Sequence, residues 1–178
     1  RPARSSSETT DSNDSDIDQN PRHPNDYRCH MLDHSLPSVV SLDQINDFIG
    51  GNFAGNTNSC EEISFGSAVA VMHPNPNTLR PGKIISGPTV FGICDAALFY
   101  AALSCTSFEP MTLTSEMSIR FLRPARGEVI RARGVVHTIA GRNIVGTVVA
   151  WTDDETKPVA VSQGTYVRPK RDSSTVGS

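Results

Sequence analysis

The feature that most constrains this chain is one helical segment that is apolar on almost every side. It reads SGPTVFGICDAALFYAAL, predicts a helix over 88–105 and carries a single acid, Asp95. Asp95 interrupts the segment well short of the roughly 18–20 uncharged apolar residues that a membrane span needs. We therefore expect no membrane partner, and a helix that protein covers on nearly every face.

Four strands predicted after this helix can supply the cover. They lie in MTLTSEMSIRFLRP, GEVIRARGVVHTIA, NIVGTVVAWTD and PVAVSQGTYVRP, and GRN at 141–143 is a short hairpin signal. Sequential strands with tight turns imply an antiparallel sheet. The sequence therefore predicts an α+β fold in which one curved antiparallel sheet wraps a long central helix. In the first strand, alternation puts these residues on one face: Leu113, Ser115, Met117, Ile119 and Phe121.

Before this helix, the sequence predicts one short helix, one strand and a loop. SLDQINDFIGG predicts a short helix with Ser41 as its N-cap, ended by Gly50-Gly51. Residues 63–73, ISFGSAVAVMH, read as a single strand. HPNPNTLRPGK then has three prolines and no periodicity, which indicates a loop.

Both ends of the chain differ in composition from the middle. Residues 1–30 are rich in Ser, Asp, Asn and Pro and nearly free of apolar residues, so they cannot offset the entropy of ordering. The last ten residues, PKRDSSTVGS, read the same way. We expect disordered tails at 1–37 and 170–178 around one domain at 38–169. The first residues also lack the apolar core of an export signal.

Charge and cysteine content argue against several classes of protein. The net charge of -3, with acids and bases mixed, argues against a nucleic acid partner. The four cysteines show neither a CxxC pair nor zinc spacing. No histidine pair has metal spacing either. These features predict reduced structural thiols in a cytoplasmic protein without a metal site.

Three stretches together resemble the PaaI-type acyl-CoA thioesterases of the thioesterase superfamily. They are LRPGKIISGPTVFGICDAAL, SEMSIRFLRPARGEVIRARG and GRNIVGTVVAW. The resemblance covers about 60–169 and implies the hotdog fold, a curved antiparallel sheet around a central helix. It also implies hydrolysis of an acyl-CoA to the free acid and CoA. No cofactor is implied, since CoA enters only as part of the substrate.

The resemblance assigns roles to residues at the head of the helix. The family's HGG triplet falls on Ser86-Gly87-Pro88. The amide of Gly87 then corresponds to the oxyanion donor, and Asp95 to the catalytic carboxylate, acting as general base or nucleophile. Thr114 falls on an auxiliary Ser or Thr. A helix N-terminus with a glycine for close approach suits stabilisation of a tetrahedral intermediate.

Helix geometry adds an inference that is independent of the family. Gly87 and Asp95 are eight residues apart, which is roughly 12 Å along a helix at about 1.5 Å per residue. One thioester carbonyl cannot touch both residues of the same chain. If both are catalytic, the site combines two chains, and the protein is a homodimer or a dimer of dimers.

The CoA end of the substrate carries phosphates, which favour arginine. Arginines follow the first strand in FLRPAR and occupy the hairpin turn, and Arg80 stands where the family often has an upstream amide, with Asn77 nearby. The candidate substrate-binding residues are Arg80, Ser86, Thr89, Arg123, Arg126 and Arg142.

Two other functions remain open at this stage. The first is an acyl-CoA-binding protein that has kept the fold without the chemistry, which the missing histidine and amide would suit. The second is a hotdog dehydratase or hydratase. The absence of a histidine at the helix head disfavours it, because those enzymes rely on one.

Overall fold

The computed structural model describes residues 32–53, 55 and 57–170. Of the tails predicted to be disordered, 1–37 and 170–178, residues 1–31 and 171–178 lie outside these residues. The main elements, in chain order, are α1 (Leu42–Asn52), β1 (Asn58–Ser64), β2 (Ser67–Met72), α2 (Gly87–Leu103), β5 (Leu113–Phe121), β6 (Ile130–Ala140), β7 (Asn143–Trp151) and β8 (Ala160–Val167). A 3-10 turn at Pro76–Thr78 and the two-residue strands β3 (Leu79–Arg80) and β4 (Ile84–Ile85) lie between β2 and α2.

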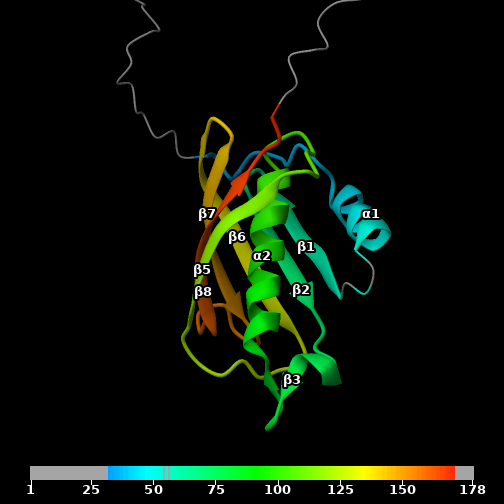
Figure 1. The fold of residues 1–178 in the computed structure, drawn as a ribbon, viewed down its shortest axis with the longest axis vertical. Helices are drawn as coiled ribbons and strands as arrows, with labels where there is room; N and C mark the ends of the chain where they lie inside the picture. The colour runs from blue at the N-terminus through cyan, green and yellow to red at the C-terminus, as the bar shows by residue number, and fades with distance from the viewer. Residues whose placement is uncertain (1–31, 54, 56, 171–178) are drawn as a thin grey trace, which may run out of the picture.

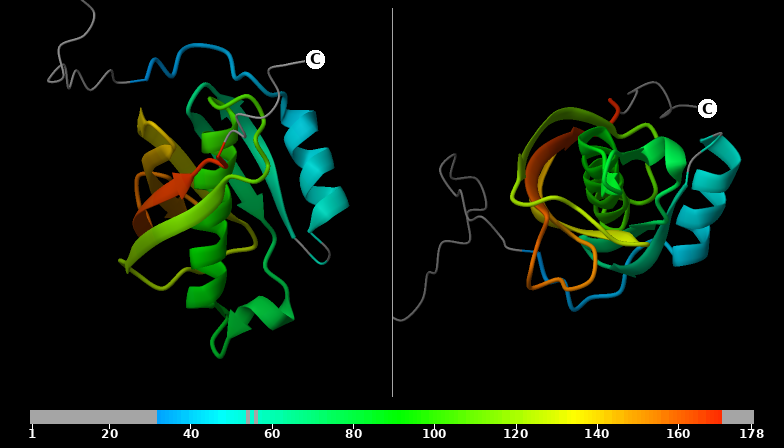
Figure 2. Two further views of the ribbon diagram at one scale, coloured as in Figure 1. Left: turned by 45° about the horizontal axis from the view of Figure 1, so that its top comes forward. Right: turned by 90° about the horizontal axis from the view of Figure 1, so that it is seen from below.

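One antiparallel sheet curls around α2, as the sequence predicts for the hotdog fold. Its strand order is β1-β2-β6-β7-β8-β5, with every pair antiparallel. Figure 1 shows α2 lying along the concave face, and the view from below in Figure 2 shows the sheet curving round the helix. The α+β prediction is therefore confirmed. Within the described residues, no helix is long and apolar enough to cross a membrane.

The start of α2 follows from its first four residues. Ser86 is the N-cap with extended backbone, and its Oγ accepts a hydrogen bond from the Thr89 amide at 3.4 Å. Pro88 occupies the first turn, where its missing N–H has no helical partner to lose. The helix runs from Gly87 to Leu103 rather than from 88 to 105.

Glycines let the sheet approach α2 closely. A Cβ on Gly134 of β6 would stand 2.4 Å from the carbonyl oxygen of Ala97 in α2. Gly146 of β7 and Gly164 of β8 face Leu98, with its methyl carbons 2.6 Å and 3.2 Å from their would-be Cβ positions. Three neighbouring strands thus each present a bare backbone to the middle of the helix.

The region before α2 differs from its prediction. The single strand expected at 63–73 is a hairpin, because Gly66 adopts a positive φ of 71° and reverses the chain between β1 and β2. The helix at Ser41 continues past Gly50-Gly51 to Asn52. It is fixed to β1 by Asn46, whose side chain exchanges hydrogen bonds of 3.0 Å and 2.8 Å with the Cys60 backbone.

A β-bulge changes which side chains of β5 face the helix. The pairing of β5 with β8 shifts between Thr114 and Glu116, so Ser115 is an extra residue. The expected face of Leu113, Ser115 and Met117 is therefore wrong at its first two positions, which are both exposed. Beyond the bulge, Met117 and Ile119 pack against the core as expected.

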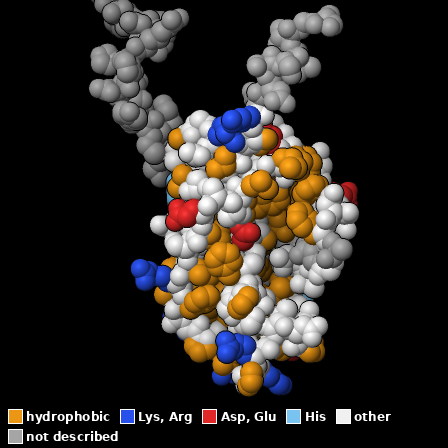
Figure 3. Space-filling view, in the orientation of Figure 1, with side chains coloured by type: hydrophobic (Ala, Val, Ile, Leu, Met, Phe, Trp, Pro, Cys, Tyr) orange, Lys and Arg blue, Asp and Glu red, His pale blue; other side chains and the backbone are white. Residues whose placement is uncertain are grey.

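The sheet leaves one stripe of α2 uncovered. Along one side of the helix, exposed or half-buried residues recur at helical spacing, and these are Pro88, Phe91, Gly92, Asp95, Ala96 and Phe99. Figure 3, viewed from the side on which α2 lies in front, shows hydrophobic side chains gathered on this face. The helix that was expected to be covered on nearly every side thus keeps an open apolar stripe, and Asp95 lies in it.

The contact at Gly134 is the most direct test of this packing. Gly134→Ala forces a methyl group into the α2 backbone, and such overpacking costs about 1–3 kcal/mol of unfolding free energy. Gly50→Ala is the matched control, since its Cβ meets nothing within 4 Å and alanine stabilises a helix by about 0.5–1 kcal/mol over glycine. Urea unfolding measures both, and equal stability of the two variants would contradict the packing.

Candidate active site

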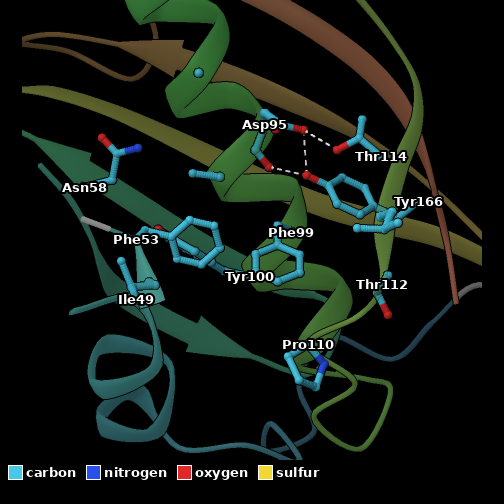
Figure 4. Close-up of a pocket in the computed structure, with 13 residues that line it drawn as sticks. Ile49, Phe53, Asn58, Asp95, Phe99, Tyr100, Pro110, Thr112, Thr114 and Tyr166 are labelled. Atoms are coloured by element: carbon cyan, nitrogen blue, oxygen red, sulfur yellow. Dashed lines mark hydrogen bonds between the residues drawn. The ribbon is translucent and has the colours of Figure 1, made fainter. Parts of the chain in front are cut away.

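Asp95 lies at the wall of a cavity between α2, α1 and the start of β5. The cavity has a volume of about 290 Å³. Its lining residues are Ile49, Phe53, Asn58, Gly92, Asp95, Ala96, Phe99, Tyr100, Pro110, Thr112, Leu113, Thr114 and Tyr166. Figure 4 shows Asp95, Thr114 and Tyr166 meeting at one end and the aromatic rings spread along the other.

Two side chains hold one oxygen of the Asp95 carboxylate. Thr114 Oγ1 donates to Oδ1 at 2.9 Å, and Tyr166 Oη lies 2.5 Å from the same oxygen (Figure 4). The tyrosine hydroxyl also lies 2.9 Å from the Asp95 carbonyl oxygen. Both partners are positioned by the β5–β8 pairing, in which Thr114 faces Tyr166 directly. The structure therefore brings together Asp95 and Thr114, two of the predicted site residues.

Tyr166 is the residue that the sequence analysis missed. It sits in the alternating strand GTYV and looks like any core aromatic, with only 3% of its surface exposed. Burial, and secondarily the nearby Asp95 carboxylate, raises the pKa of Tyr166. The hydroxyl therefore keeps its proton at neutral pH and can act as a constant donor to Asp95. The only sequence signal is that a buried tyrosine needs a partner for its hydroxyl.

The rest of this cavity is mostly apolar. The Phe99 and Tyr166 rings stack with centroids 5.8 Å apart, and Phe53 and Ile49 close the cavity from the α1 side. Thr112 Oγ1 is buried and lacks a hydrogen-bond partner among the described residues. A cavity of this kind suits an apolar or aromatic group that enters beside the carboxylate.

Gly87 lines a different cavity, at the N-terminal end of α2. Its volume is about 400 Å³, and its walls include the predicted residues Arg80 and Arg123 together with Phe121. A Cβ on Gly87 would meet the Phe121 ring at 3.5 Å, an ordinary contact. Because Gly87 and Asp95 line separate cavities, no single-chain site contains both.

The other predicted residues have local partners. The Ser86 and Thr89 hydroxyls are 2.7 Å apart and bond each other at the helix start. Arg126 donates to the Gly82 carbonyl oxygen and so fixes the turn between β3 and β4. Arg142 lies in the β6–β7 turn and donates to the Arg168 carbonyl oxygen at 2.7 Å. Arg80 and Arg123 thus line the cavity of Gly87, whereas Arg126 and Arg142 do not.

Asn77, the amide that the sequence offers near Arg80, does not line the Asp95 cavity. Asn77 lies in the 3-10 turn and is exposed, away from the Asp95 cavity. Asn58, at the start of β1, supplies an amide to that cavity instead. Among the described residues, no group of three His, Cys, Asp or Glu side chains is placed to hold a metal ion.

The Tyr166 hydroxyl predicts a specific pH dependence of folding stability. Its folded pKa is raised, so its contribution is complete below about pH 10, where an unfolded tyrosine is still protonated. Above about pH 10 the unfolded chain ionises first and that contribution is lost. As the pH rises from about 9.5 to 11, the unfolding free energy of the Tyr166→Phe variant should therefore fall less than that of the parent protein. Urea unfolding across this range measures the difference, and parallel curves would contradict it.

Solved structures share the fold over most of their length. A provisionally assigned thioesterase of a Silicibacter species superposes with a TM-score of 0.68 at 21% identity, covering 76% of this chain and 96% of its own. Zebrafish thioesterase superfamily member 2 superposes with a TM-score of 0.64 at 15% identity, and the match covers 73% of this chain and 99% of the zebrafish chain. Escherichia coli PaaI, from the phenylacetic acid degradation operon, superposes with a TM-score of 0.62 at 22% identity. This match covers 73% of this chain and 97% of PaaI. No curated protein matches the sequence.

The sequence itself carries a family signature in its central part. Residues 82–159 match the profile of the thioesterase superfamily. This range runs from the turn before α2 to the residue before β8, and so contains Gly87, Asp95 and Thr114. The central part of the chain is thus similar in sequence to the thioesterase superfamily, and the chain shares its hotdog fold with Escherichia coli PaaI.

Proposed function

We propose that this protein is an acyl-CoA thioesterase that hydrolyses its substrate to a free acid and CoA. The proposal rests on the position and hydrogen bonds of the Asp95 carboxylate. The carboxylate lies in the open stripe of α2, at the wall of an apolar cavity, with one oxygen held by Tyr166 and Thr114. A carboxylate fixed in this way beside an apolar binding space suits attack on an acyl group.

Asp95 is the general base or the nucleophile. Tyr166 and Thr114 both bond Oδ1, and among the described residues no side chain or amide donates a hydrogen bond to Oδ2. Oδ2 is therefore the oxygen that takes a proton from water as the water attacks the thioester carbonyl, or that attacks the carbonyl itself. Either route breaks the C–S bond, and CoA leaves as the thiol once its sulfur gains a proton. When water attacks, the acyl group leaves directly as the free acid. When Asp95 attacks, the acyl group stays on Asp95 as a mixed anhydride until a water hydrolyses it to the free acid and restores the carboxylate.

The developing oxyanion needs donors that this chain cannot bring to its own Asp95. Gly87 and Asp95 are eight residues apart on α2 and line different cavities. The amide of Gly87 from a second copy supplies the oxyanion donor, at the positive end of the α2 dipole. The proposed enzyme therefore has paired sites, each built from two chains.

The two ends of the substrate have separate places in this scheme. The cavity walled by Phe53, Phe99 and Tyr166 takes the acyl group, whose apolar surface these rings bury. The phosphates of CoA lie at the basic end of the second chain, where Arg80 and Arg123 share a cavity with Gly87.

Thiol release from a panel of acyl-CoAs tests the proposal. We expect DTNB to detect CoA release with at least one aliphatic or aryl substrate, and Asp95→Asn to lower kcat by about 100-fold or more. Burial raises the pKa of the Cys60 and Cys94 thiols to about 12, so these thiols add little background. Protein without substrate is the control. Binding of acyl-CoA without turnover, or full activity in Asp95→Asn, would refute hydrolysis by this site.

The Tyr166→Phe variant tests whether Tyr166 positions the Asp95 carboxylate for catalysis. The variant keeps the ring that stacks on Phe99 but removes the donor to Oδ1. We expect kcat to fall by about tenfold, as for loss of one hydrogen bond to a charged group, with KM nearly unchanged. Phe99→Leu is the matched control, since it alters the cavity wall and should mainly change KM and acyl preference. An unchanged kcat in Tyr166→Phe would remove the tyrosine from the site.

A further inference from the structure

We propose that the contact between the Phe48 and Phe108 rings sets the length of the acyl group that the Asp95 cavity accepts. Phe48 lies on α1, and Phe108 lies in the loop between α2 and β5. Neither ring lines the cavity, so both are positioning residues that hold its far wall in place. The inference rests on the proposed function only in taking this cavity as the place of the acyl group.

The loop between α2 and β5 keeps an unfavourable conformation. Ser107 and Phe108 follow one another with φ of 62° and 48°, in the left-handed region that residues other than glycine, asparagine and aspartate seldom adopt. Farther on, Thr112 buries a hydroxyl that lacks a hydrogen-bond partner among the described residues. Such features persist only where surrounding contacts hold them, and they cluster at ligand sites.

Two contacts hold the loop in this conformation. The Phe108 ring meets the Phe48 ring edge-on, with centroids 5.5 Å apart and an interplanar angle of 86°. The next residue, Glu109, forms an ion pair with Arg168 through two hydrogen bonds of 2.6 Å and 2.8 Å. The ion pair is largely shielded from water, since only 21% of the arginine side chain and 20% of the glutamate side chain are exposed. The strained residue is thus fixed to α1, and its neighbour to the residue that follows β8.

The loop supplies one wall of the cavity, and α1 supplies the neighbouring wall. Pro110 of the loop lines the cavity, as do Ile49 and Phe53 on the side of α1. Figure 4 shows Ile49 and Pro110 on the side of the cavity away from Asp95. The Phe53 ring packs edge-on against Phe48, with centroids 5.7 Å apart. Phe48 therefore joins the wall formed by α1 to the loop.

The space between Asp95 and this far wall is short. Tyr100, which lines the cavity, lies five residues after Asp95 on α2, roughly 7.5 Å along the helix. Thr112 lies two residues before Thr114, the partner of Asp95, roughly 7 Å along an extended chain. Both measures lead to the end where α2 stops and the loop begins. An acyl group with its carbonyl at Asp95 therefore meets the loop after only a few carbon atoms.

The two walls are anchored separately, and the ring contact joins them. Helix α1 is fixed by the buried side chain of Ile45 and by Asn46, which exchanges two hydrogen bonds with the Cys60 backbone. The loop has its own anchor at Glu109. A longer acyl group has to push the walls apart, and its binding then loses the contact between the rings. The ring pair should therefore act as the stop for the acyl chain.

Binding of S-alkyl-CoA thioethers measures the length limit without any catalysis. These probes keep CoA and the alkyl chain but lack the carbonyl group that is attacked. For the parent protein, we expect affinity to rise about fourfold with each buried CH₂ group and then to stop rising at a limiting length. Isothermal titration calorimetry with a series from ethyl to hexadecyl measures that limit.

Truncating either ring should move the limit. Phe108→Ala leaves empty space behind the loop, so we expect the limiting length to increase by about two carbon atoms or more, while shorter probes bind within about twofold of the parent. Phe48→Ala should shift the limit in the same direction. Because the two rings form one contact, the double variant should shift it little further than either single variant.

Ser107→Gly is the matched control. Glycine adopts a φ of 62° without a steric penalty, so this variant relieves strain in the same loop while leaving both rings in place. We expect its length limit to equal that of the parent. Phe108→Leu is the conservative variant, and its shift should be smaller than that of Phe108→Ala. Circular dichroism checks that each variant folds, and if Phe108→Ala does not, the comparison of Phe108→Leu with Ser107→Gly decides.

These measurements do not depend on catalysis, so the proposal and the proposed function can fail separately. A limit that moves in the ring variants and not in Ser107→Gly supports the proposal, even if no acyl-CoA is hydrolysed. An unchanged limit in a folded Phe108→Ala variant would overturn it, even if the parent hydrolyses acyl-CoA. So would an equal shift in Ser107→Gly, or a parent affinity that does not depend on chain length.

Discussion

The structure depends on how one apolar helix is covered. Helix α2 has apolar side chains on almost every face. Nearly all of its surface must therefore be covered by protein to be kept from water. The curved sheet buries most of the helix, and the glycines at positions 134, 146 and 164 let strand backbones approach its middle. What the sheet does not reach is a single stripe that contains Asp95. The site follows from that incomplete cover.

The Asp95 carboxylate is tolerated in this apolar stripe because hydrogen bonds stabilise its charge. An isolated carboxylate among apolar groups is costly, and hydrogen bonds to the charged form offset that cost. Tyr166 and Thr114 provide two such bonds from neighbouring strands. The bulge at Ser115 follows directly after Thr114, which pairs with Tyr166, so a local irregularity of β5 borders the site.

Much of the fold could be predicted from the sequence, because its signals are local. The four strands after α2 and their hairpin turn follow from alternation and turn residues. The first helix follows from Ser41, which forms a capping box with Gln44. The hairpin at Gly66 and the bulge at Ser115 were not predictable, since each depends on one residue's backbone within an otherwise regular pattern. Tyr166 was missed for another reason: its partner lies 71 positions away, and no spacing rule connects them.

In the proposed enzyme, each active site combines Asp95 of one chain with Gly87 of another. This arrangement is tested by mixing two inactive variants, Asp95→Asn and Gly87→Val, and unfolding and refolding them together. If the sites are shared, half of the dimers are mixed and each has one intact site, so about one quarter of the parent activity returns. If each chain holds a complete site, the mixture stays as inactive as the two variants alone, and this result would contradict a site shared between chains.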